Sequence, residues 1–214
     1  MQTRNVLIVD DHPIVRQGLS QLINAEGDLE VCGDAASVEE ARDLLESSEP
    51  DVVILDLSLP DSDGLELLKQ IRRETRHLPV LVLSMHDESM YAERLLSAGA
   101  NGYIMKQAAA DQLLTALRRV LAGGVYVSEG LGAIMIERIS GDGRRANANP
   151  IERLSNRELQ VLNLIGQGRT TREVAETLNL SVKTVESHRQ RIKKKLNLQT
   201  SAQLVKFAVS SYAQ

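Results

Sequence analysis

The sequence predicts an α/β protein in which a doubly wound, five-stranded parallel sheet is followed by a small all-α domain of four helices. Two observations point to this fold class. In the first 122 residues, short apolar runs alternate five times with segments whose apolar residues recur every three or four positions. That alternation is typical of parallel strands joined by crossover helices. After residue 150, four further segments keep only the helical spacing.

The five apolar runs are the expected strands, at residues 6–9, 30–33, 52–55, 80–83 and 102–104. Most are unbroken apolar stretches rather than alternating ones, which favours a sheet buried on both faces by helices. The helical spacing lies between and after them, in the stretches 15–22, 38–45, 65–68, 95–98 and 113–120. Right-handed crossovers then place helices on both sides of the sheet.

The chain is expected to divide into a first domain at 1–122, a connecting segment at 123–150 and a second domain at 151–214. Within the connecting segment, residues 129–139 have a helical pattern. Residues 138–150 (RISGDGRRANANP) lack an apolar period and are rich in Gly, Asn and Arg, which is typical of a linker. The four helices of the second domain are expected near 155–166, 171–178, 181–196 and 200–211.

The charges are distributed unevenly along the chain. Residues 1–137 carry a net charge of −12, residues 138–150 of +2 and residues 151–214 of +6. The basic second domain is therefore a candidate for binding a polyanion. No stretch approaches the roughly 18 apolar residues that span a membrane, the N-terminus lacks a signal-peptide pattern, and the single Cys excludes an internal disulfide. We therefore expect a cytoplasmic protein without a membrane partner.

Polar side chains suited to phosphate chemistry follow the predicted strands. Asp10 and Asp11 end the first strand, Asp56 the third and Ser84 the fourth, and Lys106 lies just beyond the fifth. Because sites in parallel sheets lie at the carboxyl ends of the strands, these groups should converge. Mg²⁺ is the natural cation to relieve repulsion among the three carboxylates. Together with the ammonium, it would neutralise a phosphoryl group that Asp56 accepts as a nucleophile.

The alternative for a single strand-end aspartate is a turn former or helix cap. It accounts for the acidic residues at 61–63 (DSD), ahead of Gly64. It explains poorly why acids, a hydroxyl and a lysine all occur at strand ends.

Four motifs in this order, LIVDDHP, ILDLSLPDSDGLE, LSMHD and GYIMK, resemble the receiver domain of two-component response regulators, over about residues 4–122. The resemblance implies that Asp56 is the phosphoacceptor. It implies that Mg²⁺ is bound by Asp11 and Asp56 directly, by the Ser58 carbonyl, and by Asp10 through water. The implied switch residues are Ser84, Tyr103 and Lys106.

Residues 171–196 predict two helices with a tight turn at 178–180 (LNL), and Ser181 is a suitable N-cap for the second. One face of that second helix is expected to carry Val182, Val185, Ile192 and Leu196. The opposite face is expected to carry Lys183, Glu186, Ser187, Gln190 and Lys194, with Arg189, Arg191, Lys193 and Lys195 on the flanks. This arrangement fits a helix-turn-helix whose second helix enters the major groove. A solvated amphipathic helix is the alternative.

The exposed face suggests separate roles in DNA binding. Ser187 and Gln190 can read base edges, and Glu186 can accept a hydrogen bond from a cytosine amine. Phosphate contacts are expected from Lys183, Thr184, His188, Arg191 and Lys194.

The stretch LSNRELQVLNLIGQGRTTREVAETLNLSVKTVESHRQRIKKKL resembles the LuxR/NarL-type DNA-binding domain, over about residues 151–213. The resemblance implies base reading by Glu186, Ser187 and Gln190. It also implies a homodimer contact through residues Ser201–Tyr212, to which Leu204, Val205, Ala208 and Val209 are suited. Many relatives carry Lys in place of Glu186, so their target sequences do not transfer to this chain.

The two resemblances together identify the chain as a member of the NarL/FixJ family of response regulators. They imply a transcription regulator that binds double-stranded promoter DNA after Mg²⁺-dependent phosphorylation of Asp56 by a partner sensor histidine kinase. The protein is not expected to be an enzyme, apart from its receiver catalysing its own phosphorylation and dephosphorylation. Two alternatives are a Mg²⁺-dependent phosphotransfer enzyme, and a DNA-binding protein whose receiver is a constitutive interaction module.

Overall fold

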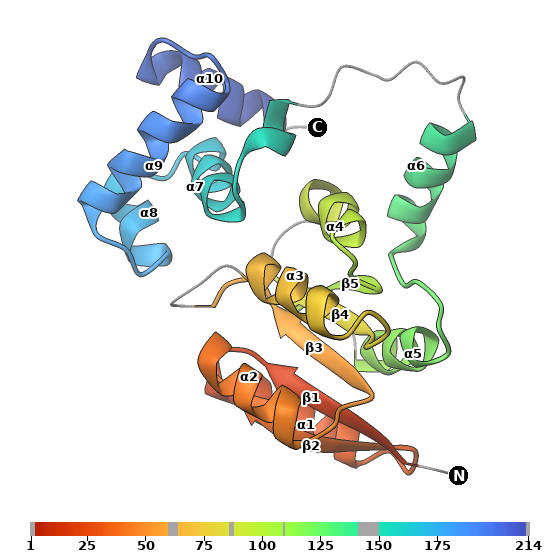
Figure 1. Ribbon diagram of the computed structural model, residues 1–214. Coiled ribbons are helices and arrows are strands. Elements are labelled where there is room, and N and C mark those ends of the chain that lie inside the picture. The colour runs from red at the N-terminus through yellow and green to blue at the C-terminus, as the bar shows by residue number, and fades with distance from the viewer. Residues whose placement is uncertain (1–2, 60–63, 86–87, 109, 141–149, 213–214) are drawn as a thin grey trace. The chain divides into compact units, whose positions relative to one another are not determined.

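The chain divides into two compact units, Met1–Asp142 and Gly143–Gln214, which are described separately in this computed structural model (Figure 1). The structure describes residues 3–59, 64–85, 88–108, 110–140 and 150–212. Most of the expected linker and the DSD stretch at 61–63 lie outside these ranges. The domain limits at 122 and 150 stay predictions.

The first unit contains the predicted five-stranded sheet. Its strands are β1 (Arg4–Val9), β2 (Leu29–Ala35), β3 (Val52–Asp56), β4 (Val80–Ser84) and β5 (Gly102–Met105). They are ordered β2-β1-β3-β4-β5, and every pair is parallel. This order confirms the doubly wound sheet, with β1 and β3 as neighbours.

Helices follow each strand, as the spacing predicts. They are α1 (Pro13–Asn24), α2 (Val38–Ser47), α3 (Gly64–Glu74), α4 (Glu88–Ser97), α5 (Ala110–Leu121) and α6 (Glu129–Ser140). One face of the sheet packs Val6 and Ile8 in a core with Leu113 and Leu117 of α5. Leu7 and Val53, which alternate with the residues of that core, are also fully buried. The sheet is therefore covered on both faces.

After α5 the chain returns to β5 in a way that the sequence pattern did not indicate. Tyr126 forms a parallel bridge with Gly102, and its carbonyl accepts the Tyr103 N–H at 2.9 Å. Two residues later, the Ser128 N–H donates to Glu88 Oε1 at 2.8 Å. The segment 125–128, which we call the return segment, thus attaches the start of α6 to both β5 and α4.

The second unit is all helical, with a short 3-10 turn at Pro150–Arg153 followed by α7 (Asn156–Gly166), α8 (Thr171–Thr177), α9 (Val182–Lys195) and α10 (Ser201–Tyr212). The predicted four-helix arrangement is confirmed. The predicted cap of α9 is also present, because Ser181 Oγ accepts the Thr184 N–H at 3.0 Å. Between α8 and α9, Asn179 takes a positive φ of 51°, which asparagine tolerates better than most residues.

A buried charge fixes the start of α7. Glu158 is 3% exposed, and one of its carboxylate oxygens accepts the Ser155 N–H at 2.7 Å while Ser155 Oγ accepts the Glu158 N–H, which forms a capping box. The same oxygen, Oε2, lies 2.6 Å from Lys195 Nζ at the end of α9. Burial alone would raise the pKa of Glu158, but these hydrogen bonds hold the pKa below its usual value.

Among the described residues, none of the helices combines the length and the hydropathy that crossing a membrane requires.

Candidate functional sites

The carboxyl ends of β1 and β3 bring Asp10 and Asp56 together, as predicted. Both residues are 1% exposed, an unusual environment for carboxylates. Asp56 is the last residue of β3, and Asp10 follows β1, where its N–H donates to the Ala35 carbonyl at 3.0 Å. Asp10 Oδ1 also accepts the His12 N–H at 2.9 Å. Asp10 therefore stabilises a turn as well, so its roles as a turn former and as a member of the acidic site are compatible.

Lys106 lies between the two buried carboxylates. Its Nζ is 2.6 Å from Asp10 Oδ2 and 2.8 Å from Asp56 Oδ2, and its side chain is 7% exposed. The backbone holds it there, because the Lys106 N–H donates to the Ser84 carbonyl at 2.7 Å. Burial alone would lower the pKa of the Lys106 ammonium, but the carboxylates of Asp56 and Asp10 outweigh burial and raise it. Lys106 is therefore a fixed cation at neutral pH.

The electrostatics of Asp56 are a balance between burial and this cation. Burial raises the pKa of the Asp56 carboxyl above its usual value, while the charge and the hydrogen bond of Lys106 lower it and the neighbouring charge of Asp10 raises it further. A poorly solvated carboxylate held by one ammonium is a better nucleophile than one surrounded by water.

Four side chains at this end of the sheet offer metal ligands within 4.8 Å of one another: Asp10, Asp11, His12 and Asp56. Asp10 Oδ2 and Asp11 Oδ1 are both buried. Lys106 Nζ lies 2.6 Å from Asp10 Oδ2, and His12 Nδ1 lies 2.6 Å from Asp11 Oδ1. Three carboxylates with spare oxygens fit a hard divalent cation such as Mg²⁺. His12 was missed by sequence reasoning, and a nitrogen ligand suits Mg²⁺ poorly.

The remaining predicted pocket residues lie on the adjoining strands and loops. The Ser58 N–H donates to Asp56 Oδ1 at 3.1 Å, which leaves the predicted role of its carbonyl a prediction. Ser84 ends β4 and Tyr103 lies in β5, and both are fully buried. Their motion in a switch stays a prediction.

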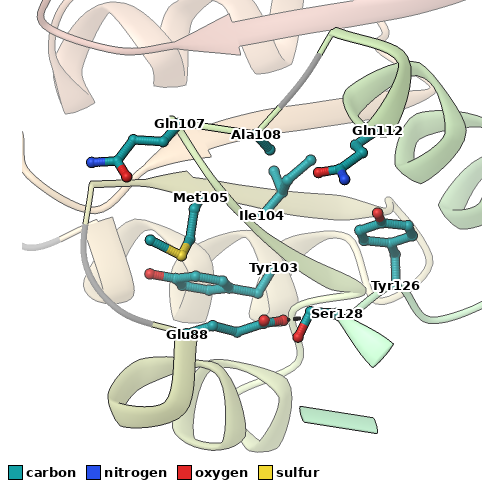
Figure 2. Close-up of a pocket in the computed structure, with 9 residues that line it drawn as sticks. All are labelled: Glu88, Tyr103, Ile104, Met105, Gln107, Ala108, Gln112, Tyr126 and Ser128. Atoms are coloured by element: carbon teal, nitrogen blue, oxygen red, sulfur yellow. Dashed lines mark hydrogen bonds between the residues drawn. The ribbon is translucent and has the colours of Figure 1, made fainter. Parts of the chain in front are cut away.

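A cavity of about 250 Å³ lies beside β5 and the return segment (Figure 2). Tyr103 and Met105 line it from β5, and Glu88 and Ser128 line it where their hydrogen bond joins α4 to the return segment. The ring of Tyr103 therefore adjoins open space and is not packed on all sides by side chains.

In the second unit, α9 presents a polar face as predicted. The five residues expected on that face are all exposed: Lys183, Glu186, Ser187, Gln190 and Lys194. Val185 and Ile192 are fully buried, but Val182 is 49% exposed. The prediction that Val182 packs inside was wrong: Val182 is the first residue of α9, and its side chain is exposed.

The cations expected on the flanks of α9 differ in their surroundings. Arg191 is exposed, whereas the Arg189 side chain is only 14% exposed and points back to α8, with Nη1 3.3 Å from Thr171 Oγ1. The predicted phosphate contact Thr184 is half-buried and bonded to Ser181, with 2.8 Å between the two hydroxyls. His188 is also half-buried, and burial lowers its pKa, so its ring is neutral at pH 7.

The helix expected to form a dimer contact, α10, is only partly available. Leu204 and Ala208 are buried inside the unit, whereas Val205 and Val209 are 42% and 48% exposed. Of the four apolar residues predicted to form the contact, only Val205 and Val209 are therefore accessible to a partner.

Two family profiles match this chain. The profile of the response regulator receiver domain matches residues 6–118, and that of the bacterial regulatory proteins of the LuxR family matches residues 152–208. The oxygen regulatory protein NreC of Staphylococcus carnosus (strain TM300) is 38% identical over 208 residues, which cover 95% of this chain and 96% of NreC. NreC of Staphylococcus aureus (strain USA300) is also 38% identical over the same shares.

Solved structures of response regulators also resemble this chain. A LuxR-family two-component response regulator from Aurantimonas sp. SI85-9A1 is 35% identical with a TM-score of 0.60, covering 65% of this chain and all of that one. RcsB of Salmonella enterica serovar Typhimurium, bound to the promoter rprA in the presence of the phosphomimetic BeF₃⁻, is 29% identical with a TM-score of 0.62, covering 97% and 99% of the two chains. A further structure contains two RcsB dimers bound to two parallel DNAs.

Proposed function

Because this chain belongs to the response regulators that join a receiver domain to a LuxR-type DNA-binding domain, we propose that its DNA binding is switched by phosphorylation of Asp56. The observation that carries the proposal is the buried group of Asp56, Asp10 and Lys106, in which one ammonium lies within 2.8 Å of both carboxylates. A partner histidine kinase is the proposed phosphoryl donor, and promoter DNA the proposed target.

Asp56 is the proposed nucleophile. One of its carboxylate oxygens attacks phosphorus, the bond from phosphorus to the leaving atom of the donor breaks, and that atom takes the bonding pair, leaving an acyl phosphate on Asp56. Lys106 is already beside Asp56 Oδ2 and can follow the charge onto the phosphoryl oxygens. Asp10, Asp11 and Asp56 are the proposed Mg²⁺ ligands, with the Ser58 carbonyl. Bound Mg²⁺ would supply neutralising charge to the phosphoryl group. The same groups would serve self-phosphorylation from a small donor and self-dephosphorylation.

The proposed switch starts from the added charge. An aspartyl phosphate brings roughly −1.5 to −2 charges into the pocket, and Ser84 and Lys106 are the groups placed to respond. Tyr103 links this response to the rest of the chain, because its N–H donates to Tyr126 in the return segment and its ring adjoins the cavity beside α4. Movement of β5 or α4 would therefore reach the start of α6, which leads toward the DNA-binding domain.

The exposed face of α9 is the proposed DNA contact. Glu186, Ser187 and Gln190 are proposed to meet base edges. Lys183, Thr184, His188, Arg191 and Lys194 are proposed to meet phosphates, with His188 acting as a neutral group. A homodimer through Val205 and Val209 of α10 would pair two such faces.

The test is DNA binding by the full-length protein before and after treatment with Mg²⁺ and acetyl phosphate. We expect the donor to increase affinity in the wild type and to have no effect on Asp56→Asn. Asp43→Asn, an exposed aspartate in α2, is the matched control and should respond as the wild type does. An identical affinity of the wild type and Asp56→Asn, with and without the donor, would rule out the switch. Varying the salt concentration separates phosphate contacts from base contacts in each measurement.

A further inference from the structure

Glu186 is the one acidic residue on the exposed face of α9 described above, and its carboxylate is held in place. Glu186 Oε1 accepts a hydrogen bond from Thr171 Oγ1 at 3.1 Å and lies 3.7 Å from Arg189 Nε. Arg189 Nη1 in turn donates to Thr171 Oγ1 at 3.3 Å. Thr171 of α8 and Arg189 of α9 therefore both approach one carboxylate oxygen of Glu186, whose side chain is 50% exposed.

The other oxygen, Oε2, has no hydrogen-bond partner among the described residues. A free glutamate side chain loses rotamer freedom when it docks, whereas Glu186 has lost much of it already. A carboxylate can only accept hydrogen bonds. It therefore favours a base edge that donates, and it is repelled by the acceptors O6 and N7 of guanine and O4 of thymine.

Arg189 has a different role from the exposed cations of α9. Its side chain is 14% exposed, and its guanidinium is engaged with Thr171 and Glu186. An arginine held in this way is unsuited to reaching a phosphate. Arg191, only two residues further along the helix, is exposed and remains the proposed phosphate contact. Its charge balances that of Glu186 and lowers the repulsion between this carboxylate and a nearby DNA backbone.

We propose that Thr171 and Arg189 are positioning residues that hold Glu186 for one base pair, so that the protein selects a cytosine amine at one position of its target. Glu186 is then the residue that touches the base, and Thr171 and Arg189 act through it. The inference rests on the proposed contact between α9 and the major groove.

The first experiment selects binding sites for the full-length protein from a random duplex library, and then measures affinities for the selected site and for the same site with one base pair changed. We expect the wild type to prefer C·G at one position by roughly 5- to 150-fold. Glu186→Gln should lose this preference and move it toward A·T, because an amide also donates. Thr171→Val should reduce the preference about fivefold, the usual worth of one hydrogen bond, without affecting other positions.

Two variants of threonine control for side effects of the substitution. Thr177→Val removes a hydroxyl from the same helix, but that hydroxyl donates only to the Glu173 carbonyl, so base preference should match the wild type. Thr171→Ser retains the hydroxyl, and we expect it to retain the C·G preference of the wild type. Thermal unfolding of each variant establishes that the DNA-binding unit is folded before the affinities are compared.

The second experiment compares two arginines by the salt dependence of binding to non-specific DNA. Arg191→Gln should lower the slope of log affinity against log salt by about one, as expected for a lost phosphate contact. Arg189→Gln should leave that slope unchanged and still weaken the C·G preference. A slope that falls equally in both variants would show Arg189 to be a phosphate contact and would overturn the inference.

Two further results would also overturn it. One is a wild-type protein that binds DNA but has no C·G preference that depends on Glu186. The other is a Thr171→Val variant whose C·G preference is as strong as that of the control Thr177→Val. Neither result depends on acetyl phosphate. A failure of the phosphorylation switch is recognised separately, because the affinity for the selected site would then be the same with and without the donor.

Discussion

Replacing Lys106 with methionine removes the cation that lies between two buried carboxylates. Methionine keeps most of the length of the side chain, so the change is largely one of charge. The side chains of Asp10 and Asp56 are 2% and 1% exposed, and both lie within 2.8 Å of the ammonium. The variant therefore retains two adjacent negative charges in a poorly solvated site without a partner.

The expected cost follows from that geometry. Removing one partner of a buried ion pair costs about 3–5 kcal/mol of folding free energy. We expect a loss in this range for the first unit at pH 7.5 without Mg²⁺. It should be measured by urea unfolding of full-length Lys106→Met with a probe in that unit.

The pH dependence of the loss has a definite sign. Burial already raises the pKa of Asp56 in the folded protein, and loss of Lys106 raises the pKa further. A carboxyl whose folded pKa exceeds its unfolded value contributes stability when protonated and loses it as the pH rises through the folded pKa. Lys106→Met should therefore lose stability, relative to the wild type, as the pH rises from about 4. Added Mg²⁺ should stabilise the variant by binding its carboxylates.

Lys69→Met is the matched control. Lys69 forms an ion pair with Glu66 at 2.7 Å, nearly the same distance, but the two side chains are 47% and 63% exposed. Its loss should cost less than about 1 kcal/mol. Equal unfolding midpoints for the two variants at pH 7.5 would refute the argument from burial, and a Lys106→Met variant that is insensitive to Mg²⁺ would refute the metal site.

Two further predictions concern contacts outside the pocket. Glu158→Gln should destabilise the second unit by roughly 1–3 kcal/mol at pH 7, because the bond to Lys195 loses its charge. The low folded pKa of Glu158 gives stability that is lost as the pH falls below about 4.3, so chemical unfolding should show less acid sensitivity in the variant. Gly102→Ala should detach the return segment, since a Cβ atom would lie 2.9 Å from the Tyr126 carbonyl oxygen. Hydrogen exchange at the Tyr103 amide should then accelerate.

Each of these has a control within the chain. Glu173→Gln alters an exposed capping box in α8 and should lower stability less than Glu158→Gln does. Gly130→Ala adds a methyl group in α6 whose nearest neighbour, Ser128 Oγ, is 3.9 Å away, an ordinary contact, and should leave exchange at the Tyr103 amide unchanged. Equal effects in either pair would contradict the contacts assigned to Glu158 or to Gly102.

Sequence reasoning succeeded where a regular period or a strand end carried the information. The alternation of strands and helices, the convergence of Asp10 and Asp56, and the cap at Ser181 all depend on local pattern or on the general rule for parallel sheets. Lys106 was placed near Asp56 on the same grounds. That it also contacts Asp10 depends on the exact path of its side chain, which the pattern does not specify.

The errors occurred where a side chain lies at the border between two faces. Arg189 was expected on a free flank of α9, but its long side chain turns toward Thr171, 18 residues earlier in the sequence. Val182 was expected inside but begins its helix and is exposed. Helical spacing indicates which residues lie near the centre of a helix face. Whether a side chain at the border of that face is buried depends on its tertiary neighbours.

The return segment also has a consequence for keeping the first unit in solution. Without Tyr126, β5 would present unpaired backbone N–H and C=O groups along the outer side of the sheet, a template on which a second chain can add a strand. A chain cut at residue 122, where the helical pattern of α5 ends, would therefore expose a strand prone to aggregation. A chain that continues through Ser128 would keep the Tyr103 N–H and the Asn101 carbonyl bonded to Tyr126, and it should remain monodisperse at concentrations where the shorter one precipitates.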